Sequence, residues 1–379
     1  MKKSKKNTRQ TKTKLTAKSD STIFSRFKNI AWSKRSKIGK LGVILAAILI
    51  ITIVGAYGTS QWYKNKHANE PLKLGTTFIP NYAEYFGLDA KDTLQTIIDD
   101  LGITRFRLVT YWKDYEPEPN AYDFTELDWQ FDMIEEAGGE ISLSLGLRQP
   151  RWPECHGPEW AMEKPFAEWS SDLKDFMGEI IDRYKDREVL VEYQLENEYF
   201  LEVFGECPDF SRERLVNQFN FIRDKDPSRP IMVSRSNNAT PSWPIRAPRA
   251  DIVGAAIYKR VFDKTITNRY FEYPYPEWFY SFLAGATELT TGRNTMIHGL
   301  QMEAWLPEGF NMRNSELEEM YKSFSPDDVA PRIQYAVDSG IRTIDLWGAE
   351  WWYHLKVNRD APEMWENAKA ELDHYRNSN

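Results

Sequence analysis

Polar and apolar positions divide the chain into three successive patterns. A polar, lysine-rich stretch covers residues 1–40, and an uninterrupted apolar run, LGVILAAILIITIVGAY, follows over residues 41–57. From residue 72 onward, short apolar runs alternate with longer amphipathic stretches. The short runs have the length of buried strands, and the longer ones repeat apolar residues at helical spacing. The pattern therefore predicts a membrane-length segment ahead of one α/β domain.

Eight strands are expected in that domain, separated by helices such as those over residues 88–102, 166–186, 211–225 and 327–340. Strict alternation of strand and helix predicts a parallel sheet with crossover helices, and eight repeats favour a single (β/α)8 barrel over an open sheet. No GxGxxG or Walker loop follows the first strand, which argues against a nucleotide-binding fold. The expected strands cover residues 73–79, 105–109, 140–145, 189–195, 230–234, 251–258, 295–303 and 342–347.

The charge of the chain is distributed unevenly. Residues 1–40 hold 14 Lys or Arg residues against Asp20 alone, a balance of +13, and because the whole chain carries −7 the remainder carries −20. A basic flank on one side of an apolar segment orients its basic end toward the cytoplasm. We therefore expect a cytoplasmic tail at 1–40, a transmembrane signal anchor at 41–58, a linker at 59–71 and an extracytoplasmic domain at 72–379. A cleaved signal peptide is the alternative, because Val54, Gly55 and Ala56 resemble a cleavage site, and both interpretations export the domain.

Nucleic acid, metals and cofactors are not expected as partners. The first twenty residues of the basic arm contain no aromatic residue and an apolar segment follows the arm, so a lipid-facing tail is the simpler interpretation. The chain has neither CxxC nor HExxH spacing, and its five histidines are scattered, so no metal site is visible. The only cysteines, Cys155 and Cys207, are compatible with one disulfide in an exported domain or with two separate thiols.

Alternate residues of a barrel strand point toward the axis and toward the helices, which predicts where polar side chains lie. On the seventh expected strand one alternate set suits the helix layer, and this places Glu303 inside the barrel at the C-terminal end of the strand. The set assigned to the helix layer is Met296, His298, Leu300 and Met302.

By the same rule Arg107, Tyr258 and Trp347 face inward on the second, sixth and eighth strands. Asn197 and Glu198 stand at the end of the fourth. Barrel enzymes carry their active sites at the C-terminal ends of the strands. We therefore expect these five residues and Glu303 to meet in one site.

Two glutamates on nearly opposite strands indicate paired carboxylate chemistry. Cleavage of an acetal needs an acid to protonate the leaving oxygen and a carboxylate to meet the developing oxocarbenium ion. When the two groups lie about 5 to 5.5 Å apart, the carboxylate is a nucleophile and configuration is retained. An arginine and a tyrosine near Glu303 would keep it ionised. A less cationic setting would raise the pKa of Glu198, so that it could act as an acid.

The strand-four segment EYQLENEYF, residues 192–200, raises a geometric conflict. Alternation places Asn197 and Glu198 on opposite faces, although both are expected to reach one substrate. The strand is therefore expected to bulge or end near Glu196, as strands beside active sites often do. Gln194 and Glu196 are then expected to support the barrel interior.

With these residues in place, the chain resembles the retaining (β/α)8 glycosidases of glycoside hydrolase clan A over residues 72–376. That clan ends strand four with an Asn-Glu pair and strand seven with a Glu. The resemblance implies that Glu198 is the acid/base, that Asn197 holds the sugar 2-hydroxyl, and that Glu303 is the nucleophile. It further implies substrate contacts for the residues that match an Arg after strand two, a Tyr after strand six and a Trp after strand eight, namely Arg107, Tyr258 and Trp347.

Two segments sharpen the resemblance. QLENEY, residues 194–199, is similar to the strand-four motif of families 35 and 42. YWKDYEPEPNAYDFTELDW, residues 111–129, resembles their W-x-x-x-E-P…G-x-Y-D-F stretch, with Asn120 where Gly is usual, and Glu116 is expected to fix that loop. The chain departs from these families at Phe200, where Gly is common, and from family 5 at Ala256 and Arg148, so no single family is matched throughout.

Aromatic residues crowd the expected loops, where sugar faces stack on such rings. Loop position favours sugar contact for Trp305 and Trp347, and Glu350 could bind a sugar hydroxyl or brace its loop. Cys155 and Cys207 fall on neighbouring loops and could be bridged there. The remaining loop aromatics belong to the core or to a sugar cleft: Trp112, Trp152, Trp160, Tyr199, Trp243, Trp351 and Trp352.

The sequence thus predicts a membrane-tethered, extracytoplasmic retaining glycosidase that cleaves β-linked glycans without a cofactor. Its expected partners are a carbohydrate substrate and the membrane. Two alternatives stay open, a catalytically inactive glycan-binding surface barrel and a transglycosylase with the same catalytic residues.

Overall fold

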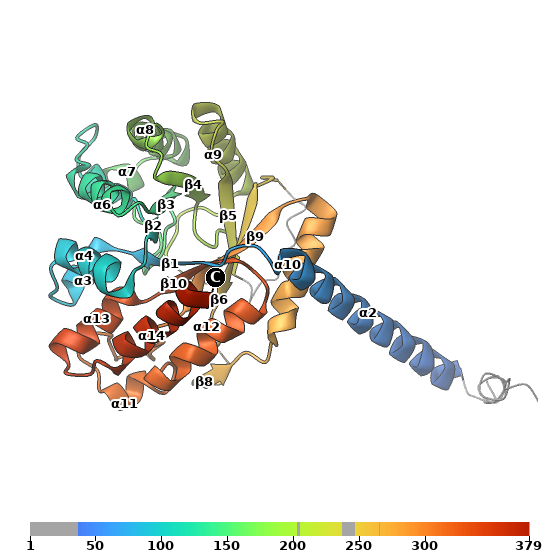
Figure 1. The fold of residues 1–379 in the computed structure, drawn as a ribbon. Helices are drawn as coiled ribbons and strands as arrows, with labels where there is room; N and C mark the ends of the chain where they lie inside the picture. The colour runs from blue at the N-terminus through green and yellow to red at the C-terminus, as the bar shows by residue number, and fades with distance from the viewer. Residues whose placement is uncertain (1–36, 203–204, 237–246, 265, 379) are drawn as a thin grey trace, which may run out of the picture. The chain divides into compact units, whose positions relative to one another are not determined.

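The computed structural model describes residues 37–202, 205–236, 247–264 and 266–378, so most of the basic arm and Trp243 lie outside the described residues. Eight parallel strands close into a barrel in the order β1-β10-β9-β6-β5-β4-β3-β2 (Figure 1). The ends of all eight lie within two residues of those expected, which confirms the (β/α)8 barrel. The strands are β1 (Lys73–Phe78), β2 (Arg105–Leu108), β3 (Glu140–Leu145), β4 (Leu190–Leu195), β5 (Ile231–Ser236), β6 (Ile252–Ile257), β9 (Asn294–Gln301) and β10 (Thr343–Trp347).

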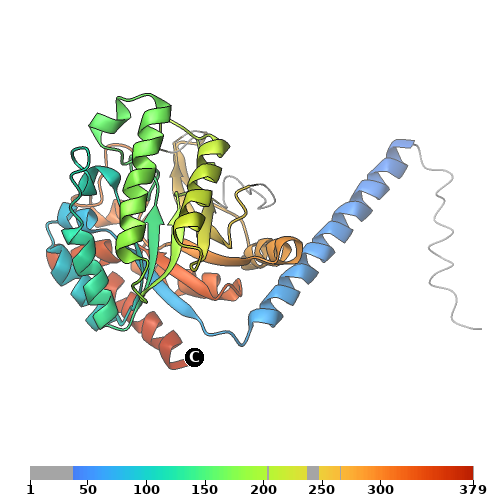
Figure 2. The same ribbon diagram turned by 90° about the horizontal axis from the view of Figure 1, so that it is seen from above.

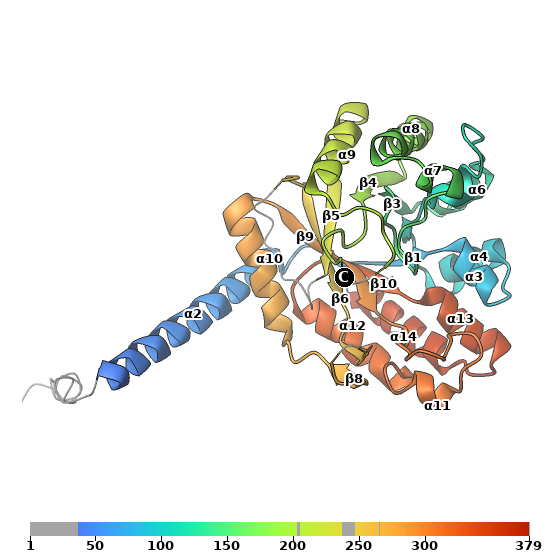
Figure 3. The same ribbon diagram turned by 180° about the vertical axis from the view of Figure 1, so that it is seen from behind.

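Helices surround the strands, as Figures 1 and 3 show from opposite sides. An antiparallel hairpin of β7 (Arg260–Asp263) and β8 (Arg269–Glu272) follows β6, and the sequence pattern did not predict it. The helices are α2 (Lys37–His67), α3 (Pro80–Tyr85), α4 (Ala90–Leu101), α5 (Trp112–Tyr115), α6 (Thr125–Glu136), α7 (Glu159–Met162), α8 (Phe166–Tyr184), α9 (Arg212–Lys225), α10 (Glu277–Thr291), α11 (Leu317–Met320), the 3-10 turn η2 (Pro326–Asp328), α12 (Val329–Asp338), α13 (Ala349–Asn358) and α14 (Glu363–Ser378).

Helix α4 illustrates why these segments fold as they do. The Asp89 side chain caps its start by accepting the backbone N–H of Asp92 at 2.9 Å. Gly102 ends it in the left-handed region at φ +62°, a conformation that glycine adopts at little cost. Leu94 and Ile97 are fully buried on its inner face, and helices of this kind stand alongside the strands in Figure 2.

The lower barrel interior is a buried ionic layer. Arg105 donates to Glu192 at 2.6 Å and to Asp345 at 2.9 Å. Burial opposes the charge on Arg105, but these two carboxylates outweigh it and raise its pKa. A Cβ at Gly75 would stand 2.5 Å from the Asp345 carboxylate and 2.7 Å from the Arg105 carbonyl, so only glycine fits there. The polar layer fixes the positions of β1, β2, β4 and β10 relative to one another.

The side-chain orientation expected for β9 was wrong in its first half. The Nδ1 atom of His298 lies 2.6 Å from Nη1 of Arg107, so His298 points into the barrel and does not face the helices. The pairing of β9 with both neighbours shifts between Ile297 and Leu300, which inserts one residue and resets the alternation. Glu303 therefore still points inward, although the strand does not alternate continuously.

Helix α2 is, among the described residues, the one helix long and apolar enough to cross a membrane. The chain divides into two units, residues 1–55 and 56–379. Within the second unit the end of α2 packs on α10, where Tyr57 meets Trp278 at 6.1 Å between ring centroids and His67 Nε2 lies 2.8 Å from a Glu288 carboxylate oxygen. Most of the expected linker at 59–71 is therefore helical.

Candidate active site

The carboxylate of Glu303, two residues beyond β9, accepts four hydrogen bonds. Arg151 Nη1 donates to Oε1 at 2.9 Å and Nη2 to Oε2 at 2.8 Å. Trp347 Nε1 donates to Oε1 at 2.6 Å, and the Tyr82 hydroxyl donates to Oε2 at 3.1 Å. A bidentate guanidinium is among the strongest partners of a carboxylate. Glu303 is therefore held by donors from three different parts of the chain.

Arg151 comes from the loop after β3 and was not predicted as a site residue. Its guanidinium carbon lies 3.2 Å from the ring centroid of Tyr82 and 4.5 Å from that of Trp347. Its backbone is left-handed at φ +78°, and its carbonyl accepts the N–H of Glu154 at 2.7 Å. The segment LRQPRW contains two arginines, and only Arg148 had been singled out by comparison with a family pattern.

Arg107 faces inward, as expected, but its described hydrogen bonds are with other residues of the barrel interior. Its Nε donates to Thr77 at 2.8 Å, and Nη1 donates to Gln194 at 3.2 Å and to His298. Its guanidinium carbon lies 5.4 Å from the centroid of the Trp347 ring. Arg107 thus supports the floor of the site, and the arginine that pairs with Glu303 is Arg151.

The tip of β4 breaks where the sequence required it. The strand ends at Leu195, and Glu196 and Glu198 have φ values of +55° and +45°. The Glu196 carboxylate accepts the backbone N–H groups of Leu147 at 3.1 Å and Arg148 at 2.7 Å, and Arg214 of α9 donates to it at 2.5 Å. Glu196 therefore ties the strand tip to the next loop and to a helix, and the expectation that it supports the barrel interior was wrong.

Glu198 is partly exposed at this tip, and its backbone N–H donates to Ser234 Oγ at 2.8 Å. Desolvation raises the pKa of its carboxyl to about 7, against the opposing influence of Arg148 and Arg107. A carboxyl with such a pKa carries a proton on a large share of molecules near neutral pH. The two glutamates therefore have different surroundings, because Glu303 accepts four hydrogen bonds whereas desolvation raises the pKa of Glu198.

Asn197 is buried beside a third carboxyl group that the sequence did not suggest. Its Oδ1 accepts from Gln194 at 3.2 Å, and its Nδ2 donates to Glu154 Oε2 at 3.1 Å. Burial raises the pKa of Glu154 to about 8, although Arg148 lowers it. Glu154 thus orients the amide of Asn197 from the opposite loop.

A disulfide bridge closes that loop. Cys155 and Cys207 are joined with an S–S distance of 2.01 Å and a Cα–Cα distance of 5.3 Å. The bridge links the loop after β3 to the loop after β4, and Cys155 directly follows Glu154. It therefore holds together the two loops that carry Arg151, Glu154 and Glu198.

Tyr258 and Trp305 form one edge of the site. Tyr258 follows β6 directly, and its ring packs edge-to-face against Trp305 at 5.5 Å between centroids. Burial first, then the charges of Glu303 and Glu198, raise the pKa of Tyr258 well above its usual value. Tyr258 is thus near both carboxylates and carries its phenol proton.

Two further glutamates fix loops. Glu116 accepts Trp112 Nε1 at 2.6 Å and the backbone N–H of Asn120 at 2.8 Å, which confirms its expected role. Glu350 accepts the N–H of Ile79 at 2.7 Å, and burial raises its pKa to about 7 despite Arg151.

The aromatic residues expected on the loops differ in exposure. Trp152, beside Arg151, is 59% exposed. Four of the other expected loop aromatics are buried in the core, namely Trp112, Tyr199, Trp351 and Trp352.

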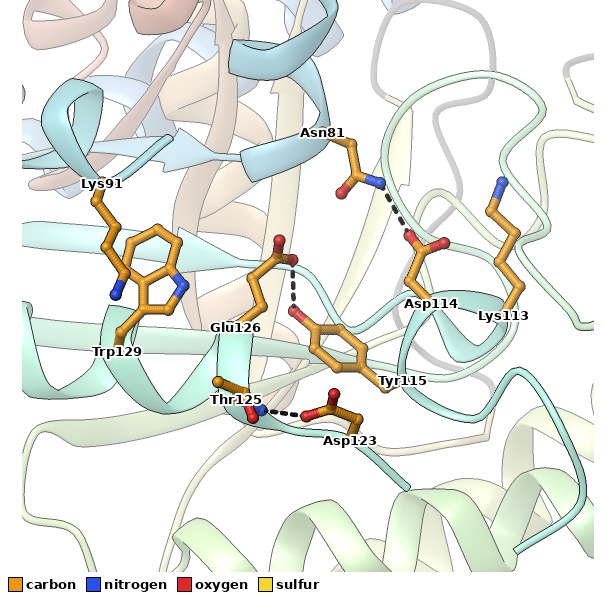
Figure 4. Close-up of a pocket in the computed structure, with 9 residues that line it drawn as sticks. All are labelled: Asn81, Lys91, Lys113, Asp114, Tyr115, Asp123, Thr125, Glu126 and Trp129. Carbon is orange, nitrogen blue, oxygen red and sulfur yellow. Dashed lines mark hydrogen bonds between the residues drawn. The ribbon is translucent and has the colours of Figure 1, made fainter. Parts of the chain in front are cut away.

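A separate pocket of about 620 Å³ is lined by residues of α3, α4, α5 and α6 (Figure 4). Asn81 and Asp114 are hydrogen-bonded across it at 3.1 Å, and the Tyr115 hydroxyl donates to Glu126 at 3.3 Å. Neither Glu198 nor Glu303 lines this pocket. No group of three His, Cys, Asp or Glu side chains suited to a metal occurs in the described part of the chain. The lining residues are Asn81, Lys91, Lys113, Asp114, Tyr115, Asp123, Thr125, Glu126 and Trp129.

Comparison with known proteins shows what the fold is similar to. No protein family model and no curated protein matches the sequence. A β-galactosidase from the Antarctic haloarchaeon Halorubrum lacusprofundi superposes with a TM-score of 0.55 at 12% identity, over 80% of this chain and 58% of that one. This chain therefore spans somewhat more than half of that protein.

Two other solved structures are similar over more of their length. A GH5_18 protein from Streptomyces cattleya, solved with GlcNAc, gives a TM-score of 0.53 at 10% identity over 81% of this chain and 80% of that one. Xylanase 10B from Thermotoga maritima gives 0.51 at 13% identity over 80% and 96%. The chain thus has the (β/α)8 barrel fold that these glycoside hydrolases share.

Proposed function

We propose that the protein is a retaining glycoside hydrolase that cleaves β-glycosidic bonds, with Glu303 as nucleophile and Glu198 as acid/base. The observation that carries the proposal is the contrast between these two carboxyls at the ends of β9 and β4. Glu303 is compensated by four donors, whereas desolvation raises the pKa of Glu198 to about 7. Different surroundings are how one fold gives two carboxyl groups different roles in a reaction. The barrel fold shared with known glycoside hydrolases supports the same conclusion.

The proposed reaction has two steps. Glu198 gives its proton to the glycosidic oxygen while a Glu303 oxygen attacks the anomeric carbon, which forms a covalent glycosyl-enzyme. Glu198, now ionised, then takes a proton from water, and this water releases the sugar with its original configuration. Asn197 is placed beside the acid to bind a sugar hydroxyl, and Tyr258 donates to the substrate between the two carboxyls.

Replacement of Glu303 by Gln tests the assignment. The Glu303→Gln protein should lose hydrolysis of activated aryl β-glycosides, because an amide cannot form the glycosyl-enzyme. Glu272→Gln is a suitable control, because Glu272 is a half-exposed glutamate of β8 that has no proposed step. Proton NMR of the first product anomer tests the mechanism separately, and early release of the inverted anomer would rule out double displacement. Full activity of Glu303→Gln would refute the nucleophile assignment.

A glycan-binding barrel without catalysis is the second candidate, because the engagement of every acceptor position on Glu303 is also what a purely structural carboxylate shows. A binder would retain glycan affinity when both glutamates are replaced and would turn over no substrate. A transglycosylase would show the same dependence on Glu303 and would transfer the sugar to an added acceptor alcohol.

We further propose that α2 anchors the protein, with the basic arm in the cytoplasm and the barrel outside. The apolar helix and the disulfide between Cys155 and Cys207 support this placement, since such bridges persist in oxidising compartments. Membrane fractionation and protease treatment of intact cells test it. An anchored barrel stays with the membrane after high salt and is digested from outside, whereas a cleaved signal peptide would leave a shortened soluble protein.

A further inference from the structure

The carboxylate proposed as nucleophile has no acceptor position left for a substrate. A carboxylate offers about four lone-pair sites, and Glu303 uses two for Arg151, one for Tyr82 and one for Trp347. A nucleophilic oxygen must direct one lone pair at the anomeric carbon. One donor therefore has to leave Glu303 before the first step.

Arg151 is the donor that can leave. Tyr82 and Trp347 are only 7% and 6% exposed and belong to the packed core, whereas the Arg151 side chain is 20% exposed on a loop. Its left-handed backbone at φ +78° is a conformation that costs a non-glycine residue about 1 to 3 kcal/mol. Tyr82 and Trp347 can then stay on Glu303 and hold the freed carboxylate in place.

The present position of Arg151 is also where a sugar ring is expected. Its guanidinium covers the Tyr82 and Trp347 rings at 3.2 and 4.5 Å, and Trp347 is the ring that we expect to contact the substrate. A charge-assisted hydrogen bond is worth about 1.5 to 3 kcal/mol, so removal of the fork from Glu303 is unfavourable unless another anion receives it. The Arg151 Nε–H is buried and has no acceptor among the described residues. Arg151 thus has one donor, Nε–H, that is free for a new acceptor, and one partner, Glu303, that a second anion could replace.

We propose, as a refinement that rests on the glycosidase function above, that Arg151 is a specificity-determining residue for an acidic sugar. The carboxylate of a uronic acid residue at the cleavage position takes the guanidinium fork from Glu303 and thereby frees the nucleophile. A planar carboxylate suits the two parallel N–H groups of arginine. A neutral sugar offers no such exchange, so the same contact excludes it.

The charges around the site favour an anion. Arg107 and Arg148 are both buried close to Glu198, whose pKa they lower against desolvation. Burial meanwhile raises the pKa of Glu154 to about 8 and that of Glu350 to about 7. Near neutral pH these two carboxyls carry less than their full negative charge, so they compensate Arg148 and Arg151 only in part.

Matched aryl glycosides test the inference with the full chain in detergent. The substrates are p-nitrophenyl β-glucuronide with the β-glucoside, and the β-galacturonide with the β-galactoside. We expect kcat/KM of the unmodified protein to favour one uronide by roughly 10- to 100-fold, the factor that corresponds to one charge-assisted hydrogen bond. Arg151→Gln should abolish this preference, and Arg151→Lys, which keeps the charge without the fork, should retain part of it. Arg260→Gln, at a half-exposed arginine paired with Glu272, should keep the full preference.

The outcomes separate this inference from the proposed function. Glu303-dependent hydrolysis of the neutral glycosides with no preference for a uronide would overturn the acidic-sugar inference and leave the glycosidase assignment intact. An unchanged preference in Arg151→Gln would overturn the role of Arg151. No hydrolysis of either series by any of the proteins would overturn both.

Discussion

The ion pair between Glu196 and Arg214 holds the strand tip two residues before the proposed acid, and its removal should lower the denaturant concentration at which the protein unfolds. The Arg214 and Glu196 side chains are 2% and 0% exposed, and Nη1 donates to Oε1 at 2.5 Å. Arg214→Ala leaves the Glu196 carboxylate buried with only its two backbone donors. Loss of one partner of a buried pair costs roughly 3 to 5 kcal/mol, so we expect the free energy of unfolding to fall by that amount.

A matched arginine gives the control. Arg183 of α8 pairs with Asp128, but these side chains are 48% and 32% exposed. An exposed pair contributes about 0 to 1 kcal/mol, so Arg183→Ala should change stability little. Urea unfolding of both variants, followed by circular dichroism, measures the difference directly. Because Glu196 orients the residues after it, Arg214→Ala should also lower kcat, whereas Arg183→Ala should not.

A double variant separates the charge from the packing. Arg214→Met with Glu196→Gln removes both charges while it keeps much of the volume, and it should recover part of the stability that Arg214→Ala loses. If Arg214→Ala costs less than about 1 kcal/mol, or no more than Arg183→Ala, the buried pair does not hold the strand tip.

Three further outcomes are expected. Glu198 must be protonated to act as the acid, and desolvation raises its pKa to about 7, so kcat for glycosides with poor leaving groups should fall as the pH rises above that value. Glu198→Gln should be inactive on glycosides with poor leaving groups and should hydrolyse only activated aryl glycosides. Burial raises the pKa of Glu154 from 4.5 to about 8, so the folded state loses stability as pH rises between these values. Glu154→Gln should flatten that loss, as melting temperatures at pH 5 and pH 9 would show. Replacement of Cys155 and Cys207 by Ser should lower stability by roughly 2 to 5 kcal/mol and also lower kcat/KM, while unchanged kinetics would mean that the bridge does not position the loop.

The sequence predicted the barrel well because its strands are local apolar runs of the right length. The expected and observed ends of the strand at Glu140–Leu145 coincide, and the other strands differ by one or two residues. The β7–β8 hairpin was missed because its four-residue strands are only half buried or exposed and carry no apolar run. The apolar pattern therefore predicted the buried barrel strands and did not predict the more exposed β7–β8 hairpin.

The rule that alternate strand residues face opposite sides placed Glu303 inside the barrel correctly, although it assumed a regular strand. It assumes an uninterrupted strand, whereas β9 contains a register shift that turns His298 inward beside Arg107. For β4 the break was predicted in advance, because Asn197 and Glu198, both proposed to reach one substrate, could not share a face of a regular strand. The break in β4 was therefore predictable because two proposed site residues required it, whereas no proposed site residue required the register shift in β9.

The loop after β3 was hidden from sequence analysis because nothing periodic fixes its path. Its residues reach both halves of the proposed site: Arg151 holds the Glu303 carboxylate, and Glu154 orients the Asn197 amide beside Glu198. Cys155 fastens the same loop to the one after β4. A shift of this loop would therefore change the ion-pair partner of the proposed nucleophile Glu303 and the surroundings of the proposed acid Glu198 together. Glu303 and Glu198 lie two and three residues beyond their strands, and this loop contacts the surroundings of both, so substrate binding at the loop could affect both glutamates together.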